Sequence, residues 1–237
     1  MTPIQPGTRI PSLSLRTREG GAFLDVDTDR LFGGKTVVLF GLPGAFTPTC
    51  SSAHVPRYEE LYDAMRAQGV DEVICTSVND AFVMDAWREA QAVDKVRFLA
   101  DGNGTLAEAL GLLVDKTALG FGRRSWRYSL LVRDGVVAQA FIEAEVEGDP
   151  YEVSDADTML RHLGGAAPAD ILLFTKHGCG HCRRAKQALA EAGRPYTELP
   201  ASPTTLRALP GAETTPQVYV NGAHLGGADE LIAWLAG

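Results

Sequence analysis

Short apolar runs alternate along the chain with longer stretches that carry apolar residues at helical spacing. Three runs predict buried strands because each is short, apolar and bounded by glycine or polar turn residues. These runs are residues 37–40, 73–78 and 97–100. Helical spacing predicts helices at residues 54–67, 81–88 and 106–110. Strands that alternate with helices are typical of an α/β domain whose central sheet is flanked by helices.

Two further segments have the pattern of hairpins. Residues 10–27 carry alternating apolar positions that are separated by the polar and glycine residues of 18–21. Strand-like runs at 121–132 and 135–142 are joined through Asp134-Gly135. An Asp-Gly pair between apolar runs is a strong signal for a tight hairpin turn. Residues 154–162 then predict a helix that closes the domain.

The pattern stops at residues 163–169, which are rich in Gly, Ala and Pro and show no periodicity. We therefore predict a first domain at residues 1–162, a linker at 163–169 and a second domain at 170–237. The second domain repeats the α/β pattern in a shorter form. Its predicted elements are a strand at 171–174, a helix at 183–190, a strand at 195–198, a short helix, a hairpin that turns at Asn221-Gly222, and a last helix.

The net negative charge of the chain argues against two classes of binding partner. The 30 Asp and Glu residues outnumber the 22 Lys and Arg residues, which gives a net charge of -8. Nucleic acids and anionic membranes bind clustered Lys and Arg, so we expect neither as a partner. The N-terminus lacks the basic and apolar regions of a leader, and no apolar run approaches the length that spans a bilayer. We expect a soluble cytoplasmic protein.

The four cysteines are Cys50, Cys75, Cys179 and Cys182, too few and too unevenly spaced for a secreted disulfide framework. Cys75 lies in an apolar strand pattern, which favours a buried core thiol over a second reactive one. Cys50 follows the strand at 37–40 and a turn rich in Pro and Gly, at the start of a helical segment. Unpaired N–H groups at a helix start favour a thiolate, so we predict that Cys50 is reactive.

The spacing of Pro43, Thr47 and Cys50 resembles the Pro-x-x-x-Thr-x-x-Cys signature of peroxiredoxins, and the nearby His54 and Pro56 resemble the type-five subfamily. The resemblance implies that Cys50 attacks the O–O bond of a peroxide. It also implies that the Thr47 hydroxyl hydrogen-bonds the bound peroxide and that Pro43 shields the thiolate from water. Threonine is both a donor and an acceptor, and proline stiffens a turn without an N–H of its own, so both residue types suit these roles.

Arg127 matches the family position of an arginine that points at the reactive sulfur. A fixed guanidinium there would stabilise a thiolate and polarise a peroxide. The alternative is that Arg127 forms a solvated basic patch with Arg123 and Arg124. Some type-five members carry a second, resolving cysteine near the end of this domain, but residues 148–157 contain none. The sulfenic acid of Cys50 must then be reduced by something other than a resolving cysteine of this segment.

Cys179 and Cys182 form a Cys-x-x-Cys motif that follows a strand and opens a helix. This context indicates a thioredoxin-like redox motif. A zinc site would need a second pair of ligands at a suitable spacing, and His177 and His181 do not provide one, so we expect no metal. With Thr214-Thr-Pro216 and Gly226-Gly-Ala-Asp229, the second domain resembles glutaredoxin. The two resemblances together imply two thioredoxin-like domains, each with a mixed central sheet.

The glutaredoxin resemblance implies a site for glutathione. Thr215 and a cis Pro216 would align the tripeptide, and Lys176 would pair with one of its carboxylates. Gly227, Ala228 and Asp229 would hold the γ-glutamyl end. Cys179 would be the nucleophile, while Cys182 lies about one turn further into the helix. Glutaredoxins often have Pro-Tyr or Pro-Phe where this chain has Gly180-His181, which leaves the redox potential open.

Taken together, these features predict a glutathione-dependent peroxidase that reduces hydrogen peroxide and small alkyl hydroperoxides. Cys50 would become a sulfenic acid and would be recycled through Cys179 and glutathione. Glutathione would be a co-substrate, and no metal, haem or flavin would be bound. We expect a homo-oligomer, either a dimer or a tetramer. The alternatives are a peroxide sensor that oxidises partner proteins, a disulfide reductase on a carrier domain, and a chaperone.

Overall fold

A computed structural model describes residues 2–146, 148–167, 169–209 and 214–236 of the chain. The chain divides into two compact units, Met1–Ala167 and Pro168–Gly237, called the first and second unit below. Residues 163–167 of the predicted linker belong to the first unit, where Leu163 packs against the core and the Gly165 N–H donates to Leu160.

The first unit is built on a mixed five-stranded sheet with the order β5-β4-β3-β8-β9. Its strands are β3 (Thr36–Leu42), β4 (Glu72–Ser77), β5 (Arg97–Ala100), β8 (Tyr128–Arg133) and β9 (Val136–Ile142). β3, β4 and β5 run parallel, while β8 pairs antiparallel with β3 and with β9. The mixed sheet confirms the predicted α/β class, and the turn between β8 and β9 falls at the predicted Asp-Gly pair.

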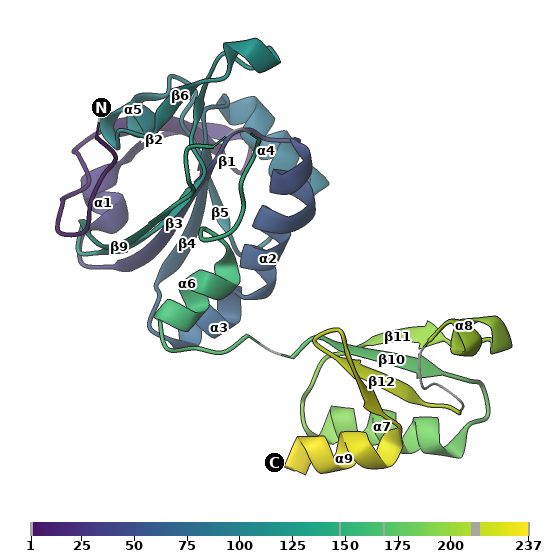
Figure 1. Ribbon diagram of the computed structural model, residues 1–237. Helices are drawn as coiled ribbons and strands as arrows, with labels where there is room; N and C mark the ends of the chain where they lie inside the picture. The colour runs from purple at the N-terminus through teal and green to yellow at the C-terminus, as the bar shows by residue number, and fades with distance from the viewer. Residues whose placement is uncertain (1, 147, 168, 210–213, 237) are drawn as a thin grey trace. The chain divides into compact units, whose positions relative to one another are not determined.

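Alternate residues of the central strand β3 enter two separate cores, because successive side chains point to opposite faces of a sheet. Val38, Phe40 and Leu42 pack on one face, and Val37 and Leu39 pack on the other. The first face is covered by α2 (Val55–Glu60), α3 (Tyr62–Ala67), α4 (Ala81–Ala90) and α6 (Ala156–His162) (Figure 1). The opposite face is covered by α1 (Thr28–Phe32), α5 (Thr105–Ala109) and the first hairpin. The sheet is therefore buried on both sides.

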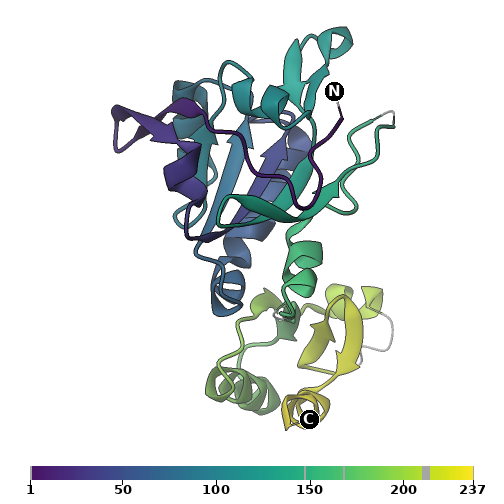
Figure 2. The ribbon, with the colours of Figure 1, turned by 90° about the vertical axis from the view of Figure 1, so that its left-hand side faces the viewer.

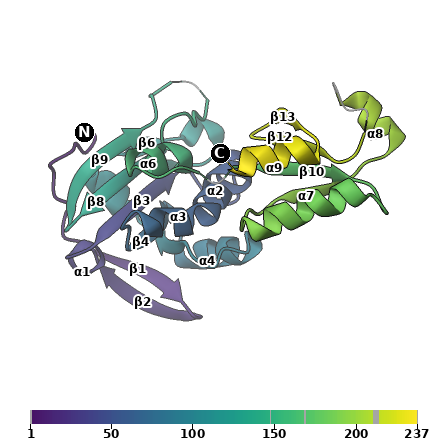
Figure 3. The same ribbon diagram turned by 90° about the horizontal axis from the view of Figure 1, so that it is seen from below.

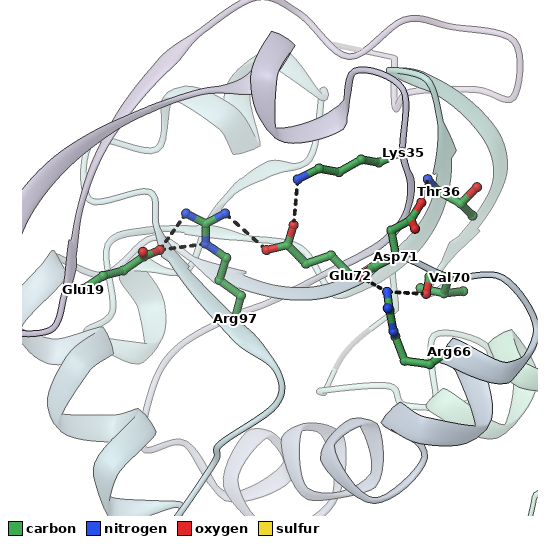
Figure 4. A network of polar contacts seen from close by, with 8 residues as sticks. All are labelled: Glu19, Lys35, Thr36, Arg66, Val70, Asp71, Glu72 and Arg97. Atoms are coloured by element: carbon green, nitrogen blue, oxygen red, sulfur yellow. Dashed lines mark hydrogen bonds and ion pairs between the residues drawn. The ribbon is translucent and has the colours of Figure 1, made fainter.

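The first hairpin, β1 (Ser14–Glu19) and β2 (Ala22–Asp27), matches the prediction and is drawn in purple in Figure 2. A charged network joins its end to the central sheet (Figure 4). Arg97 pairs with Glu19 at 2.6 Å and with Glu72 at 3.2 Å, and Glu72 also lies 3.4 Å from the Lys35 ammonium. The network links β1, β4 and β5 with the residue that precedes β3.

Two predicted elements of the first unit are each divided in the structure. The helix predicted at 54–67 is divided at Leu61, whose ψ of 4° interrupts the regular helix, although its N–H still donates to Arg57. The strand predicted at 121–132 is also divided. β7 (Arg123–Ser125) pairs with β6 (Leu113–Asp115) in a separate two-stranded sheet. The break falls at Trp126, whose backbone N–H donates to Leu112 and whose indole donates to the Glu143 carbonyl.

The second unit has a four-stranded sheet with the order β11-β10-β12-β13. Its elements are β10 (Ile171–Thr175), α7 (Gly180–Glu191), β11 (Thr197–Pro200), α8 (Pro203–Ala208), β12 (Gln217–Val220), β13 (Ala223–Gly226) and α9 (Ala228–Ala236). α7 and α9 lie side by side and enclose a core of their own with the sheet (Figures 2 and 3). Asn221 and Gly222 both have positive φ, which confirms the predicted tight turn between β12 and β13.

No helix in the described part of the chain has the length and apolar character needed to cross a membrane.

Candidate active site

The loop after β3 is fixed at both ends by close packing and hydrogen bonds. A Cβ at Gly41 would lie 2.2 Å from the ring of Tyr128, so only glycine allows β3 and β8 to approach as they do. Beyond the strand, the Thr47 hydroxyl donates to the Gly44 carbonyl at 2.8 Å, and the Ala45 N–H donates to Asn79 at 3.0 Å. These bonds set the path of the chain between the buried Pro43 and Cys50.

Cys50 begins a π-helical turn, Cys50–His54, that leads directly into α2. The Val55 N–H donates to the Cys50 carbonyl, which closes the wider turn. Short π-helical turns are rare and occur often at functional sites. Here the turn buries both Cys50 and His54 completely. The indole N–H of Trp87 donates to the Ser51 hydroxyl at 3.0 Å and fastens the turn to α4. The Cys50 sulfur is thus presented from a fixed turn into a buried environment.

Arg127 lies at the break between β7 and β8, and its side chain is only 1% exposed. Its Nη1 donates to the Cys50 sulfur at 3.5 Å, and Nη2 forms an ion pair with the Asp149 carboxylate. Burial alone would lower the pKa of Arg127, but the hydrogen bond with Asp149 and the nearby Cys50 outweigh it and raise the pKa. The side chain therefore stays cationic beside the sulfur. Burial excludes the alternative of a solvated basic patch.

His54 contacts the same guanidinium nitrogen of Arg127 as Cys50 does. Arg127 Nη1 lies 3.0 Å from His54 Nδ1, and His54 Nε2 lies 3.2 Å from the Ser154 carbonyl. Burial, and then the neighbouring Arg127, lowers the pKa of His54 to about 3. The ring of His54 is therefore neutral and carries one proton. A guanidinium can only donate hydrogen bonds, so Nδ1 accepts from Arg127 and the proton lies on Nε2, which donates to the Ser154 carbonyl. His54 thereby holds the guanidinium nitrogen Nη1 of Arg127 in a fixed position.

A buried carboxylate holds the segment that contains Ser154. One oxygen of Glu143 accepts from the N–H groups of Glu152, Val153 and Ser154 at 2.8 to 3.0 Å, and from the Ser154 hydroxyl at 2.7 Å. Burial tends to raise the pKa of Glu143, but these hydrogen bonds outweigh it and lower the pKa. The carboxylate is therefore charged at neutral pH, and it acts on the site through Ser154 and His54.

Three of these partners were not predicted as site residues. His54 follows Cys50 by four residues, a spacing that places two side chains on one helical face, so it could have been identified. Asp149 and Glu143 carry no such local signal, because each reaches its partner through the folding of a distant segment. The structure brings the predicted Cys50 and Arg127 into contact and places Thr47 and Pro43 in the loop that leads to Cys50.

Cys75 lies on β4 opposite Phe40 of β3 and is fully buried. Burial, together with the nearby Cys50, raises the pKa of the Cys75 thiol well above its ordinary value. A buried neutral thiol is a poor nucleophile because the thiolate is the reactive form. The prediction of a core thiol is confirmed.

In the second unit, Cys179 caps the start of α7 and forms a disulfide with Cys182. The Cys182 N–H donates to the Cys179 sulfur at 3.1 Å, and the Thr215 hydroxyl lies 3.5 Å from the same sulfur. The Thr215–Pro216 peptide bond is cis, as predicted. Cys179 is half-buried while Cys182 is buried, so Cys179 is the more accessible sulfur. The Thr215 carbonyl oxygen lies 3.4 Å from the Cys179 sulfur, so the backbone of Thr215 borders the accessible end of the motif.

The predicted glutathione contacts fall into two groups, one beside the Cys179 sulfur and one at the start of α9. Lys176 and Cys179 line one hollow of about 700 Å³, which Arg183 and Lys186 also border. In the second group, Gly227 lies beside the Pro216 carbonyl, since a Cβ on Gly227 would be 3.7 Å from that oxygen.

The start of α9 is occupied by contacts within the second unit. The Gly227 N–H donates to Glu230 at 2.8 Å, and the exposed Asp229 pairs with Arg184. Ala228 is buried against the core. Among the residues that the structure describes, no three His, Cys, Asp or Glu side chains gather as metal ligands would.

Known proteins match both halves of the chain. The family model Redoxin matches residues 5–160, and the model Glutaredoxin matches residues 171–225. The hybrid peroxiredoxin hyPrx5 of Haemophilus influenzae is 48% identical over 97% of this chain and 98% of its own length. The chain belongs to the peroxiredoxin family. The predicted recognition, a peroxiredoxin fused to a C-terminal glutaredoxin domain, is confirmed.

Other peroxiredoxins match about two thirds of this chain. Peroxiredoxin sll1621 of Synechocystis sp. is 52% identical over 67% of this chain and 90% of its own length. The crystal structure of reduced Prx3 from Vibrio vulnificus in complex with H2O2 has a TM-score of 0.64 and 44% identity. The match covers 68% of this chain and 99% of the Vibrio vulnificus chain. This peroxiredoxin is accordingly a thiol peroxidase, with a glutaredoxin domain joined to it.

Proposed function

We propose that the chain reduces hydrogen peroxide and small alkyl hydroperoxides with glutathione as the electron donor. The observation that carries the proposal is the buried guanidinium of Arg127 at 3.5 Å from the Cys50 sulfur, in a chain that also holds the Cys179–Cys182 pair. The complex of Vibrio vulnificus Prx3 with H2O2 supports hydrogen peroxide as a substrate.

In the first step, the Cys50 thiolate attacks one peroxide oxygen. An S–O bond forms, the O–O bond breaks, and the leaving oxygen takes up a proton and departs as water or an alcohol. Cys50 becomes a sulfenic acid and the peroxide is reduced by two electrons. Arg127 stabilises the thiolate and the charge that grows on the leaving oxygen, because a fixed cation in a buried site needs no reorganisation. The Thr47 hydroxyl orients the peroxide.

In the second step, glutathione attacks the sulfenic acid, which gives a mixed disulfide with Cys50 and releases water. The Cys179 thiolate then attacks the glutathione sulfur and returns Cys50 to its thiolate form. A second glutathione releases oxidised glutathione and restores Cys179. The Cys179–Cys182 disulfide seen in the structure must be reduced before this route operates, and glutathione can do so in two exchanges. Cys182 is needed only for that dithiol branch.

The second unit would hold glutathione by the predicted residues. Lys176 borders the hollow beside Cys179 and would pair with a carboxylate. Thr215, beside the cis Pro216, would offer its backbone to the tripeptide as an added strand does. Gly227, Ala228 and Asp229 would receive the γ-glutamyl end once the Asp229–Arg184 pair has opened.

Several expectations stay predictions. Turnover would need no bound metal, haem or flavin, since the peroxide itself supplies the oxidising equivalents. A dimer or tetramer and a cytoplasmic location are also predicted, and light scattering would measure the oligomer. Nucleic acids and membranes are not predicted partners.

The test is NADPH consumption with hydrogen peroxide, glutathione and glutathione reductase, measured on the wild type and on single Cys→Ser variants. We expect Cys50→Ser and Cys179→Ser to be inactive and Cys182→Ser to stay active. Cys75→Ser is the matched control, because it removes a buried thiol of the same unit. If Cys179→Ser turns over normally, the relay is refuted. Slow turnover with trapped mixed disulfides to other proteins would indicate a peroxide sensor.

A further inference from the structure

We propose that Asp149 is a positioning residue that sets how much of the Arg127 charge acts on Cys50. The proposal rests on the reactive role of Cys50 given above. It concerns a carboxylate that contacts the arginine and not the sulfur. Two anions, the Cys50 thiolate and Asp149, would share one buried cation.

The contacts of Arg127 show this sharing. Nη1 is turned toward Cys50 at 3.5 Å and His54 at 3.0 Å, while Nη2 is turned toward Asp149. Nε has no hydrogen-bond partner among the described residues. The planar guanidinium is rigid, so a partner at Nη2 fixes the direction of Nη1 as well. Asp149 therefore controls both the orientation of the guanidinium and the net charge beside the sulfur.

Other titratable groups around Arg127 and Cys50 contribute little charge. Burial lowers the pKa of His54 to about 3 and raises the pKa of Cys75, so both are neutral. The ring of Tyr151 lies 5.6 Å from the guanidinium carbon, and burial raises its pKa, so it is neutral too. Buried Tyr58, which packs on His54, is likewise neutral because burial raises its pKa.

Three other carboxylates nearby have partners of their own. Glu143 accepts four hydrogen bonds from the 152–154 segment, and Asp157 pairs with Arg57 at 2.7 Å. Asp155 caps the start of α6 through the Thr158 N–H. Asp149 is the carboxylate that pairs with Arg127 in the described part of the chain.

The segment that carries Asp149 is held in place on its C-terminal side. Glu143 binds three consecutive N–H groups that begin at Glu152, three residues after Asp149. Tyr151, between the two, packs its ring on His54 with centroids 4.9 Å apart. The Asp149 carboxylate is itself 40% exposed, while the arginine it meets is 1% exposed. A segment fixed by hydrogen bonds thus places the partly exposed Asp149 carboxylate against the buried guanidinium of Arg127.

The test compares Asp149→Asn with Glu145→Gln, which removes the same charge from the exposed stretch after β9. Both changes are made in full-length Cys179→Ser/Cys182→Ser protein, so that Cys50 is the reactive thiol that remains. The rate of alkylation by iodoacetamide is measured against pH, which reports the fraction of thiolate. Asparagine keeps an oxygen that can accept from Nη2 but carries no charge.

We expect the midpoint of the pH profile to move down by about 0.5 to 1 pH unit in Asp149→Asn, because the sulfur then faces an undivided cation. Below the wild-type midpoint, alkylation would be roughly 3- to 10-fold faster. Asp149→Glu is expected to restore the wild-type midpoint, and Glu145→Gln to leave it in place.

An unchanged midpoint in Asp149→Asn would overturn the proposal. So would a fall in alkylation rate at every pH without a shift, because that result describes a structural role only. Reaction of Cys50 with hydrogen peroxide is measured separately in the wild type. If peroxide does not oxidise Cys50 there, the proposed peroxidase function fails, whereas the alkylation profile still decides the role of Asp149.

Discussion

Replacement of Glu143 by alanine tests whether the site depends on a carboxylate that touches neither Cys50 nor Arg127. Glu143 accepts four hydrogen bonds from the 152–154 segment, and the Ser154 carbonyl in turn accepts from His54. Alanine would remove all four bonds at once. We expect lower stability of the first unit and a slower reaction of Cys50 with peroxide, because His54 would lose its fixed acceptor.

The size of the effect follows from the donors left without a partner. The N–H and the hydroxyl of Ser154 are buried, and each buried donor without an acceptor costs about 1 to 3 kcal/mol. Water can reach the N–H groups of Glu152 and Val153, so these add little. The free energy of unfolding would fall by roughly 2 to 6 kcal/mol. At about 2 to 4 °C per kcal/mol, the Tm of the first unit would fall by roughly 10 °C.

Differential scanning calorimetry would measure this change, and the transition of the second unit, which has its own core, would serve as an internal reference. Glu145→Ala is the control for loss of a carboxylate from the same stretch. Because hydrogen bonds lower the pKa of Glu143, its stabilisation is present above the unfolded pKa and is lost as pH falls through the lowered value. A drop of less than about 2 °C at neutral pH would refute the reasoning.

Three further changes test other parts of the molecule. Gly41→Ala would place a methyl group 2.2 Å from the Tyr128 ring and is expected to destabilise the first unit by roughly 3 kcal/mol or more in urea unfolding; a loss below about 1 kcal/mol would contradict this. Lys176→Ala is expected to raise the KM for glutathione about tenfold, as one lost carboxylate contact would, while peroxide still oxidises Cys50 at the wild-type rate; an unchanged KM would remove Lys176 from the site. Asp157→Asn is expected to cost about 1 kcal/mol at neutral pH, because its hydrogen bond and ion pair with Arg57 lower the pKa of Asp157. That stabilisation is present above the unfolded pKa and disappears as pH falls through the lowered one, so a difference from wild type that persists in acid would argue against the ion pair.

Local patterns predicted the parts of the site that local structure builds. Pro43, Thr47 and Cys50 lie within one turn and the helix start that follows it, so their spacing in the sequence is enough to predict how they are arranged in space. The alternation of short strands with helices predicted the α/β class of the first unit for a similar reason, whereas the mixed sheet was implied by the family resemblance. The position of Arg127 came from a family resemblance, since nothing in its own surroundings separates a buried cation from a surface one.

Contacts between distant segments escaped prediction. Asp149 meets Arg127 across 22 residues, and Glu143 meets Ser154 across 11, with no periodicity to mark either pair. The π-helical turn at Cys50 was also hidden, because one extra residue in a turn leaves the apolar spacing of the following helix unchanged. The break at Trp126 depends on hydrogen bonds to residues that the strand pattern does not identify.

The hydrogen bond between Trp87 and Ser51 gives the chain a built-in optical reporter. The indole of Trp87 is hydrogen-bonded to Ser51, which follows Cys50 in the chain. The fluorescence emission of Trp87 would therefore change when Cys50 is oxidised to a sulfenic acid. Trp126 is bonded instead to the Glu143 carbonyl, and Trp234 belongs to the second unit. Stopped-flow fluorescence on unlabelled protein could then time the first chemical event by itself. Replacing Trp87 with phenylalanine would show which part of the signal comes from that indole.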